Sequence, residues 1–218
     1  FILLIYLTVL FSCNYKTSKN DLENRSEQPI ERGYKLTSYE ALKKAELLKG
    51  YLSKFPERTS QEKFFEYFPN NFCELKSIFG YDETDTTEIS FGPLYEDSQR
   101  YIDAFFNKLN IDQTKIVKRV IKICYDGYWQ ADGISIFQDY LHLGMKNNIV
   151  TYITELGLEN EETILKFWHF YFDGPHPDNY QEDYQRLFLE VQVIDYRIAD
   201  IMKQSFKKLL SEHDGHGH

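Results

Sequence analysis

The sequence predicts an all-α fold: a single globular array of about eight or nine helices in residues 36–212, after a flexible N-terminal tether. Apolar residues recur at spacings of three and four along most of this region. Residues typical of helix starts and stops separate the periodic segments. No run alternates apolar with polar residues, and no hairpin dipeptide joins two apolar runs. Paired helices stacked as a solenoid are the alternative arrangement.

Nine segments are predicted to be helical. They are residues 37–54, 59–68, 72–79, 97–110, 112–125, 132–141, 152–156, 160–172 and 181–211. The first two begin at capping boxes, Thr37 with Glu40 and Thr59 with Glu62. Three later helices have a predicted capping residue: Asp112, Asp132 and Asn160. The acidic stretch 81–88 has neither helical periodicity nor the ligand spacing of an EF-hand, so we expect residues 81–97 to form a solvated loop.

Residues 167–172 read Phe-Trp-His-Phe-Tyr-Phe and form the densest aromatic cluster in the chain. Five aromatic residues in six positions are too many for one helix face, so this helix should be central and buried nearly all round. The following Asp173-Gly174-Pro175 is predicted to end it. Gly174 would adopt a left-handed conformation, where a β-branched residue is strained, and Pro175 cannot continue a helix.

Composition limits the classes of function. The 218 residues suit one compact domain, and the formal net charge is −9. Nucleic-acid binding needs clustered Lys and Arg, so this charge argues against it. An acidic surface can instead complement a basic protein partner. The sequence has no nucleophile elbow, Walker loop or dinucleotide fingerprint, and we expect no cofactor.

The N-terminus has the pattern of a processing signal. Residues 1–11 read FILLIYLTVLF, an apolar run too short to span a bilayer but of the length found in signal peptides. The first residue is not Met and no basic region precedes the run, so we expect residues 1–12 to be a signal peptide whose start lies upstream. Residues 13–35 are mostly polar and charged, which predicts a disordered tether.

The stretch Leu10-Phe11-Ser12-Cys13 resembles the lipobox of bacterial lipoproteins, although Phe11 stands where Ala, Ser or Thr is more usual. The resemblance implies that Cys13 is diacylated through its sulfur and becomes the first residue after cleavage. It also implies a lipid anchor in the bacterial cell envelope, since two or three acyl chains hold a protein stably to a membrane. We expect this membrane to be the outer membrane. The alternative is an ordinary secretory signal with an incidental Cys.

Several polar residues are candidates for chemistry. His169 and Asp173 lie four apart, and His176 follows, so the three could hold a metal ion or act in acid–base catalysis. The alternative, which we favour, is a helix-stop motif in which Asp173 orders the turn. The C-terminal tail, residues 213–218, carries three histidines that could bind Zn²⁺, Ni²⁺ or Cu²⁺ weakly: His213, His216 and His218. The tail could equally be a frayed polar end.

Two further sets of residues remain open. Trp129 lies beside Tyr125 and Tyr128, with Asp132 nearby. If this cluster is exposed, it is a candidate binding patch. We favour the alternative, in which the cluster is buried and belongs to the core. Cys73 and Cys124 are predicted to be small core residues, with a disulfide between them as the alternative in an oxidising envelope.

Residues 168–177 follow the pattern W-x-F-x-F-D-G-P-H-P, which resembles a string in uncharacterised bacterial envelope proteins that carries no known activity. Small acidic helical lipoproteins also resemble immunity proteins that neutralise envelope-directed toxins. We therefore expect a non-enzymatic protein-binding module, with an immunity-like role as its most specific form. Trp129, Asp132, Asp173 and His176 are its candidate binding residues. A metal-assisted hydrolase that uses His169, Asp173 and His176 is the competing hypothesis.

Overall fold

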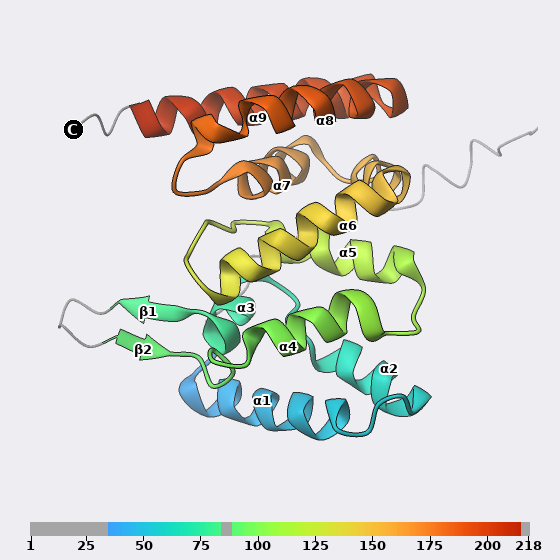
Figure 1. Ribbon diagram of the computed structural model, residues 1–218, viewed down its shortest axis with the longest axis vertical. Coiled ribbons are helices and arrows are strands. Elements are labelled where there is room, and N and C mark those ends of the chain that lie inside the picture. Colours follow the sequence, from blue (N-terminus) through green and yellow to red (C-terminus); the bar gives the residue numbers. More distant parts are fainter. Residues whose placement is uncertain (1–34, 84–88, 215–218) are drawn as a thin grey trace, which may run out of the picture.

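The computed structural model describes residues 35–83 and 89–214. These residues form nine α-helices and one two-stranded sheet, so the all-α prediction is confirmed (Figure 1). The helices are α1 Ser38–Leu52, α2 Arg58–Tyr67, α3 Phe72–Phe79, α4 Ser98–Asp103, α5 Gln113–Cys124, α6 Gly133–Leu156, α7 Glu161–Phe172, α8 Gln181–Ile194 and α9 Tyr196–Asp214. A π-helical turn, η2 Ala104–Lys108, extends α4, and a 3₁₀ turn, η3 Pro177–Tyr180, precedes α8.

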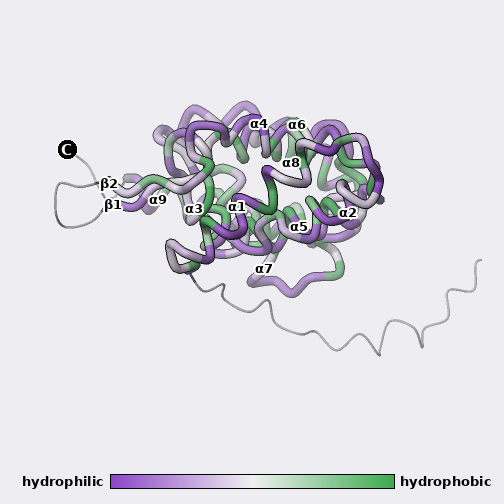
Figure 2. The backbone as a smooth tube through the Cα atoms, turned by 90° about the horizontal axis from the view of Figure 1, so that it is seen from below, coloured by the Kyte–Doolittle hydropathy of each residue, from purple (hydrophilic) through white to green (hydrophobic). Residues whose placement is uncertain are grey.

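The helices are stacked in chain order, from α1 and α2 at the bottom of Figure 1 to α8 and α9 at the top. α1 packs on α2 and α3, α6 packs on α4, α5 and α7, and α7 packs against α9. Seen from below, hydrophilic and hydrophobic residues alternate along the helices (Figure 2), as expected where each helix turns one face inward. The centre of the array is therefore the pair α6 and α7.

Three of the five predicted helix caps are confirmed. The Thr37 hydroxyl accepts a hydrogen bond from the Glu40 amide at 3.3 Å, and the Glu40 carboxylate accepts one from the Thr37 amide at 2.9 Å, which completes the predicted capping box. Asp112 and Asn160 also cap α5 and α7 with their side chains, as predicted. These three residues fix the first turns of their helices.

The capping box predicted at Thr59 is wrong. α2 begins at Arg58, Glu57 occupies the N-cap position, and no side chain caps this helix. The start is fixed instead by the buried Gln61, whose amide nitrogen donates to the Pro56 carbonyl at 2.8 Å. Its amide oxygen accepts from the Asn110 amide at 2.6 Å, so a contact with a distant segment sets this helix end.

The segment predicted as a loop over residues 81–97 begins with a β-hairpin. Strands β1 Tyr81–Glu83 and β2 Ile89–Phe91 pair antiparallel and project from the helices (Figures 1 and 2). The rings of Phe91 and Tyr95 lie 4.5 Å apart, and Tyr81 packs on both. The cross-strand contact between Tyr81 and Phe91 stabilises a hairpin that no turn dipeptide in the sequence predicts.

The single helix predicted over residues 181–211 is also wrong, because the chain breaks at Asp195 into α8 and α9. Asp195 is extended (φ −151°, ψ 109°), and its carboxylate accepts a hydrogen bond from the Ile198 amide at 3.1 Å. This is the geometry of an N-cap, which starts a new helix. α8 and α9 therefore pack against each other (Figure 1). Apolar spacing continues across the break and conceals it.

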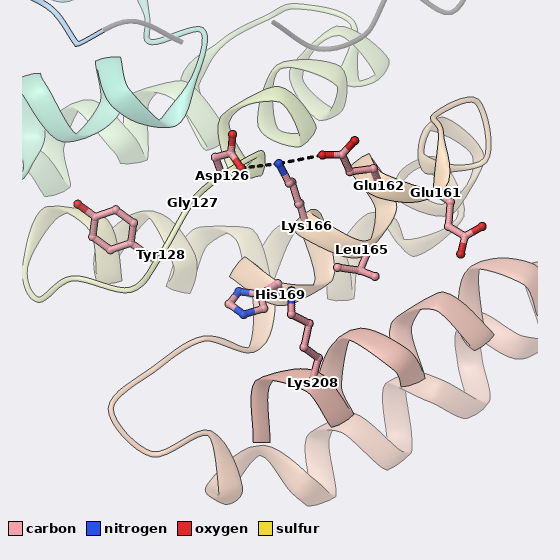
Figure 3. A pocket seen from close by; sticks show the side chains of 9 residues that line it. All are labelled: Asp126, Gly127, Tyr128, Glu161, Glu162, Leu165, Lys166, His169 and Lys208. Atoms are coloured by element: carbon pink, nitrogen blue, oxygen red, sulfur yellow. Dashed lines mark hydrogen bonds and ion pairs between the residues drawn. The ribbon is translucent and has the colours of Figure 1, made fainter. Parts of the chain in front are cut away.

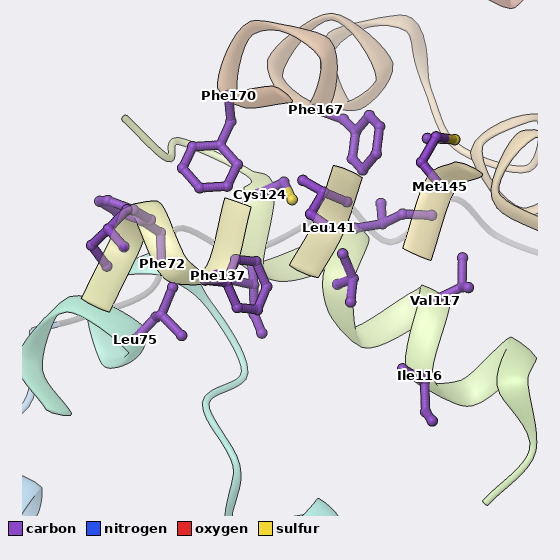
Figure 4. Close-up of a cluster of buried hydrophobic side chains, with 14 of the residues drawn as sticks. Phe72, Leu75, Ile116, Val117, Cys124, Phe137, Leu141, Met145, Phe167 and Phe170 are labelled. Carbon is purple, nitrogen blue, oxygen red and sulfur yellow. The ribbon is translucent and has the colours of Figure 1, made fainter. Parts of the chain in front are cut away.

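The two helices predicted at 132–141 and 152–156 join into α6, which is kinked at Asn148 (φ −138°, ψ 34°). Their residues turn toward α7, whose Phe167 and Phe170 meet Phe137 and Leu141 of α6 and Cys124 of α5 (Figure 4).

α7 is buried on nearly every side, as predicted. Its only exposed residues are Glu161 and Glu162, and Trp168 is wholly buried.

Close packing at Gly133, the first residue of α6, generates a stability prediction. A Cβ at this position would lie 2.1 Å from the Phe79 carbonyl oxygen at the end of α3. Gly133→Ala should destabilise the protein by about 1–3 kcal/mol through overpacking against backbone. A methyl group at Gly50 of α1 would have no neighbour within 4 Å, so Gly50→Ala should stabilise by roughly 0.5–1 kcal/mol through helix propensity. Urea denaturation measures both, and changes of the same sign would contradict this packing.

Candidate functional site

The C-terminus of α7 is capped by side chains from α6. Gln138 donates from Nε2 to the Phe170 carbonyl at 2.6 Å, and His142 donates from Nε2 to the Tyr171 carbonyl at 2.8 Å. The last carbonyls of a helix have no partner within the helix, so these bonds satisfy groups that burial would otherwise leave unpaired. The two donors lie four positions apart, on one face of α6.

The predicted left-handed Gly174 is wrong, since no described glycine has a positive φ. The chain leaves α7 through an extended Asp173 (φ −66°, ψ 139°), and the α6 side chains take the place of a glycine cap. Strain from a left-handed conformation therefore does not oppose substitution of Gly174. A Cβ there would instead meet the Tyr180 ring at 3.1 Å.

Asp173 joins the end of α7 to the segment between α5 and α6. Its Oδ2 atom accepts a hydrogen bond from the Trp129 amide at 2.6 Å. Its own carbonyl accepts from Gln138 Nε2 at 3.0 Å. The Asp173 carboxylate thus holds the backbone of a distant segment, whereas the helix-stop interpretation expected it to order its own turn.

His169, Asp173 and His176 are not brought together. His169 Nε2 lies 2.8 Å from Glu212 Oε2, which links α7 to α9. Hydrogen bonding to His169 holds the pKa of Glu212 below its ordinary value. His176 is exposed just before η3, and its carbonyl accepts from the Asn179 amide at 3.0 Å. Across residues 35–83 and 89–214, no group of three or more His, Cys, Asp or Glu is placed to hold a metal ion.

The Trp129 cluster lies at the surface more than its aromatic content suggested. Tyr128 is 44% exposed, while Trp129 and Tyr125 are partly buried. The Tyr128 ring packs on Phe72 at 4.8 Å, and its hydroxyl accepts a hydrogen bond from Lys76 Nζ at 2.5 Å. Tyr128 is therefore an exposed aromatic side chain in a fixed position.

Asp132 does not cap α6 with its side chain, contrary to the prediction. It occupies the N-cap position with a positive φ of 62°, and its carboxylate accepts a hydrogen bond from the Tyr95 hydroxyl instead. The side chain is exposed and ties the start of α6 to the segment that follows β2.

A cleft of about 640 Å³ lies beside Tyr128 (Figure 3). Segment 126–128 forms one wall, and α7 with Lys208 of α9 forms the other. Its central charge is Lys166, whose Nζ lies 2.5 Å from Asp126 and 3.1 Å from Glu162. Desolvation lowers the pKa of Lys166, but hydrogen bonds to Asp126, Tyr125 and Glu162 outweigh it and raise the pKa overall. Lys166 therefore stays charged.

Lys166 was not among the predicted site residues. The spacing of Glu162 and Lys166, four apart on a predicted helix, was a signal for one of its two ion pairs. Asp126 lies 40 positions away, and no local pattern connects it to Lys166.

The remaining candidate residues lie partly outside the described chain. Cys13, the tether, His216 and His218 fall outside it, while α9 extends beyond the predicted boundary at residue 212 and includes His213, which is exposed. Cys73 and Cys124 are free thiols, so the alternative of a disulfide between them is not formed. Burial raises the pKa of both thiols. Cys124 is wholly buried, as predicted for a core residue, whereas Cys73 is only partly buried, so the prediction for Cys73 is wrong.

No protein-family model, curated protein sequence or solved structure matches this chain. Among the described helices, none combines the length and apolar character that crossing a membrane requires.

The hydrogen bond from the Trp129 amide to the Asp173 carboxylate predicts how substitutions of Asp173 change stability. Asp173→Ala leaves the part-buried Trp129 amide without its charged partner, so it should destabilise by about 1.5–3 kcal/mol. Asp173→Asn keeps an acceptor oxygen and should cost less. His176→Ala is the control from the same segment: its side chain is exposed, and its effect should stay within about 0.5 kcal/mol. Denaturant melts measure all three, and a larger effect at His176 would contradict this assignment of roles.

Proposed function

We propose that this chain is a lipid-anchored protein of the bacterial envelope that binds a protein partner, with an immunity-like role as the most specific form. The observation that carries the proposal is the surface around Tyr128. An exposed aromatic ring is held by Phe72 and Lys76 at the rim of a cleft. Tyrosine in such a setting contributes strongly to interfaces, because it buries a large area at little cost in conformational entropy.

The net charge of the chain favours a basic partner. The cleft itself is mixed in charge: the carboxylates of Asp126, Glu161 and Glu162 line it together with the amines of Lys166 and Lys208, and Lys166 pairs with both Asp126 and Glu162. The chain as a whole has a formal charge of −9. Complementary charge of this kind raises association rates and discriminates against acidic partners. A cationic toxin or envelope protein would meet these conditions.

The geometry gives less support to the metal-assisted hydrolase. Asp173 is bound to backbone, His169 is paired with Glu212, and the exposed His176 precedes η3. A general base or metal ligand must lie within reach of the same reacting atom as its partners. Asp173 and His169 thus have separate partners and His176 is exposed, so the three side chains do not converge, whereas Tyr128, Glu161 and Glu162 line one cleft.

The lipid anchor generates its own prediction. In the producing bacterium, mass spectrometry of the mature protein should find an acylated Cys13 as the first residue. Cys13→Ser should move the protein from the membrane fraction to the soluble fraction, because the acyl chains supply the anchoring free energy. Cys73→Ser is the control and should leave fractionation unchanged. A Cys13→Ser protein that still sediments with membranes would refute the anchor.

The binding surface is tested by comparing variants in affinity purification from the envelope fraction. A basic protein should be enriched by the wild type. Tyr128→Ala should lower its recovery by about tenfold, because central interface aromatics commonly contribute more than about 1 kcal/mol. Tyr39→Ala is the matched control: Tyr39 is 73% exposed on α1 and does not line the cleft. Equal loss in both variants, or recovery of the partner that salt does not reduce, would contradict the proposed surface.

A further inference from the structure

A second cleft, of about 530 Å³, is formed by α6, the end of α7, η3 and α8. Aromatic rings make much of its wall: His142, Tyr171, Phe172 and Tyr180. Met145 and Leu187 add aliphatic surface. Small-molecule sites are commonly of this size and combine mostly apolar walls with a few fixed polar groups.

One fixed polar group is His142. Because Nε2 donates to the Tyr171 carbonyl, the proton of the neutral ring is on Nε2, and Nδ1 is an acceptor. Burial lowers the pKa of His142, so the ring is neutral at pH 7. The ring is held against Tyr171 at 4.4 Å and Tyr180 at 6.2 Å. In the described part of the chain, Nδ1 has no hydrogen-bond partner.

The second polar group is the Tyr171 hydroxyl. Burial raises its pKa, so it stays protonated and can donate. No hydrogen bond is made by this hydroxyl within residues 35–83 and 89–214, although the ring lines the cleft. The Tyr171 hydroxyl is not one of the enclosed polar atoms that lack a partner, so it is open to the cleft, where a ligand that offers an acceptor can take the place of water.

The charges at the rim balance. Arg186 and Asp183 of α8 form an ion pair with each other. Lys146 and Glu190, which also line the cleft, are exposed and of opposite sign. The rim therefore offers no net charge to a ligand.

We propose that this cleft binds a small uncharged aromatic molecule that carries a hydroxyl or amide N–H group. The ligand ring lies among the aromatic walls, its N–H or O–H donates to His142 Nδ1, and its oxygen accepts from the Tyr171 hydroxyl. This site is separate from the surface proposed to bind a protein, and neither proposal depends on the other.

The test uses p-cresol, with toluene as the same ring without a hydroxyl. Titration into ¹⁵N-labelled protein should shift amide resonances of residues that line the cleft, and p-cresol should bind more tightly than toluene. Tyr171→Phe should weaken p-cresol binding by about tenfold and leave toluene binding unchanged, because one hydrogen bond is lost. The control is Tyr152→Phe. The Tyr152 hydroxyl has no partner either, but it is enclosed and does not line this cleft, so this change should leave p-cresol binding intact.

A second pair of variants tests the location without touching the polar groups. Leu187→Trp should fill the cleft and abolish p-cresol binding, whereas Leu189→Trp, at an exposed position of the same helix, should not. Circular dichroism confirms that each variant is folded. The proposal is overturned if p-cresol binds nowhere up to its solubility limit, if its shifts map to another surface, or if Tyr171→Phe binds it as tightly as the wild type.

Discussion

Burial of α7 is the constraint on which the rest of the array depends. A helix enclosed on nearly all sides cannot leave its terminal carbonyls to water, so neighbouring elements must supply donors. Gln138 and His142 of α6 supply them at the C-terminus. On the α9 side, the Ser205 hydroxyl donates to the Leu165 carbonyl at 2.8 Å. Polar atoms on both neighbours thus fix the position of α7 in addition to the apolar contacts of Figure 4, which alone would tolerate sliding.

Both clefts are consequences of this arrangement. Lys166 and His169 project from α7 toward segment 126–128 and α9, and Tyr171 and Phe172 border the cleft with α6 and α8. The bond from Asp173 to the Trp129 amide holds the first cleft's neighbouring segment to the same helix. One helix therefore positions two surfaces of different chemistry: one with an exposed tyrosine beside ion pairs of Lys166, and one aromatic and electrically balanced at its rim.

The sequence was most informative where structure is decided locally. Caps at Thr37, Asp112 and Asn160 act on amides two or three residues away, so a short pattern contains all their partners. The break at Asp195 depends on an equally local interaction, the hydrogen bond from the Ile198 amide to the Asp195 carboxylate. Because the apolar spacing continues on both sides of Asp195, the sequence nevertheless predicted one long helix. The helix-start role of Gln61 and the end of α7 depend on partners 29 to 49 positions away. No window of sequence displays such pairs.

The fate of His169, Asp173 and His176 shows why closeness in sequence is weak evidence for a catalytic site. α7 ends between the first and second of these residues, so the i, i+4 geometry that would bring them together is lost at the extended Asp173. Each then finds its own setting: Glu212 for His169, the Trp129 amide for Asp173, and the exposed start of η3 for His176. The string from Trp168 to Pro177 thus encodes a buried helix end and its exit. A resemblance that rests on this string conveys how the chain turns at the centre of the array. The side chains available for binding lie instead on the walls of the two clefts, in residues such as Tyr128 and Tyr171.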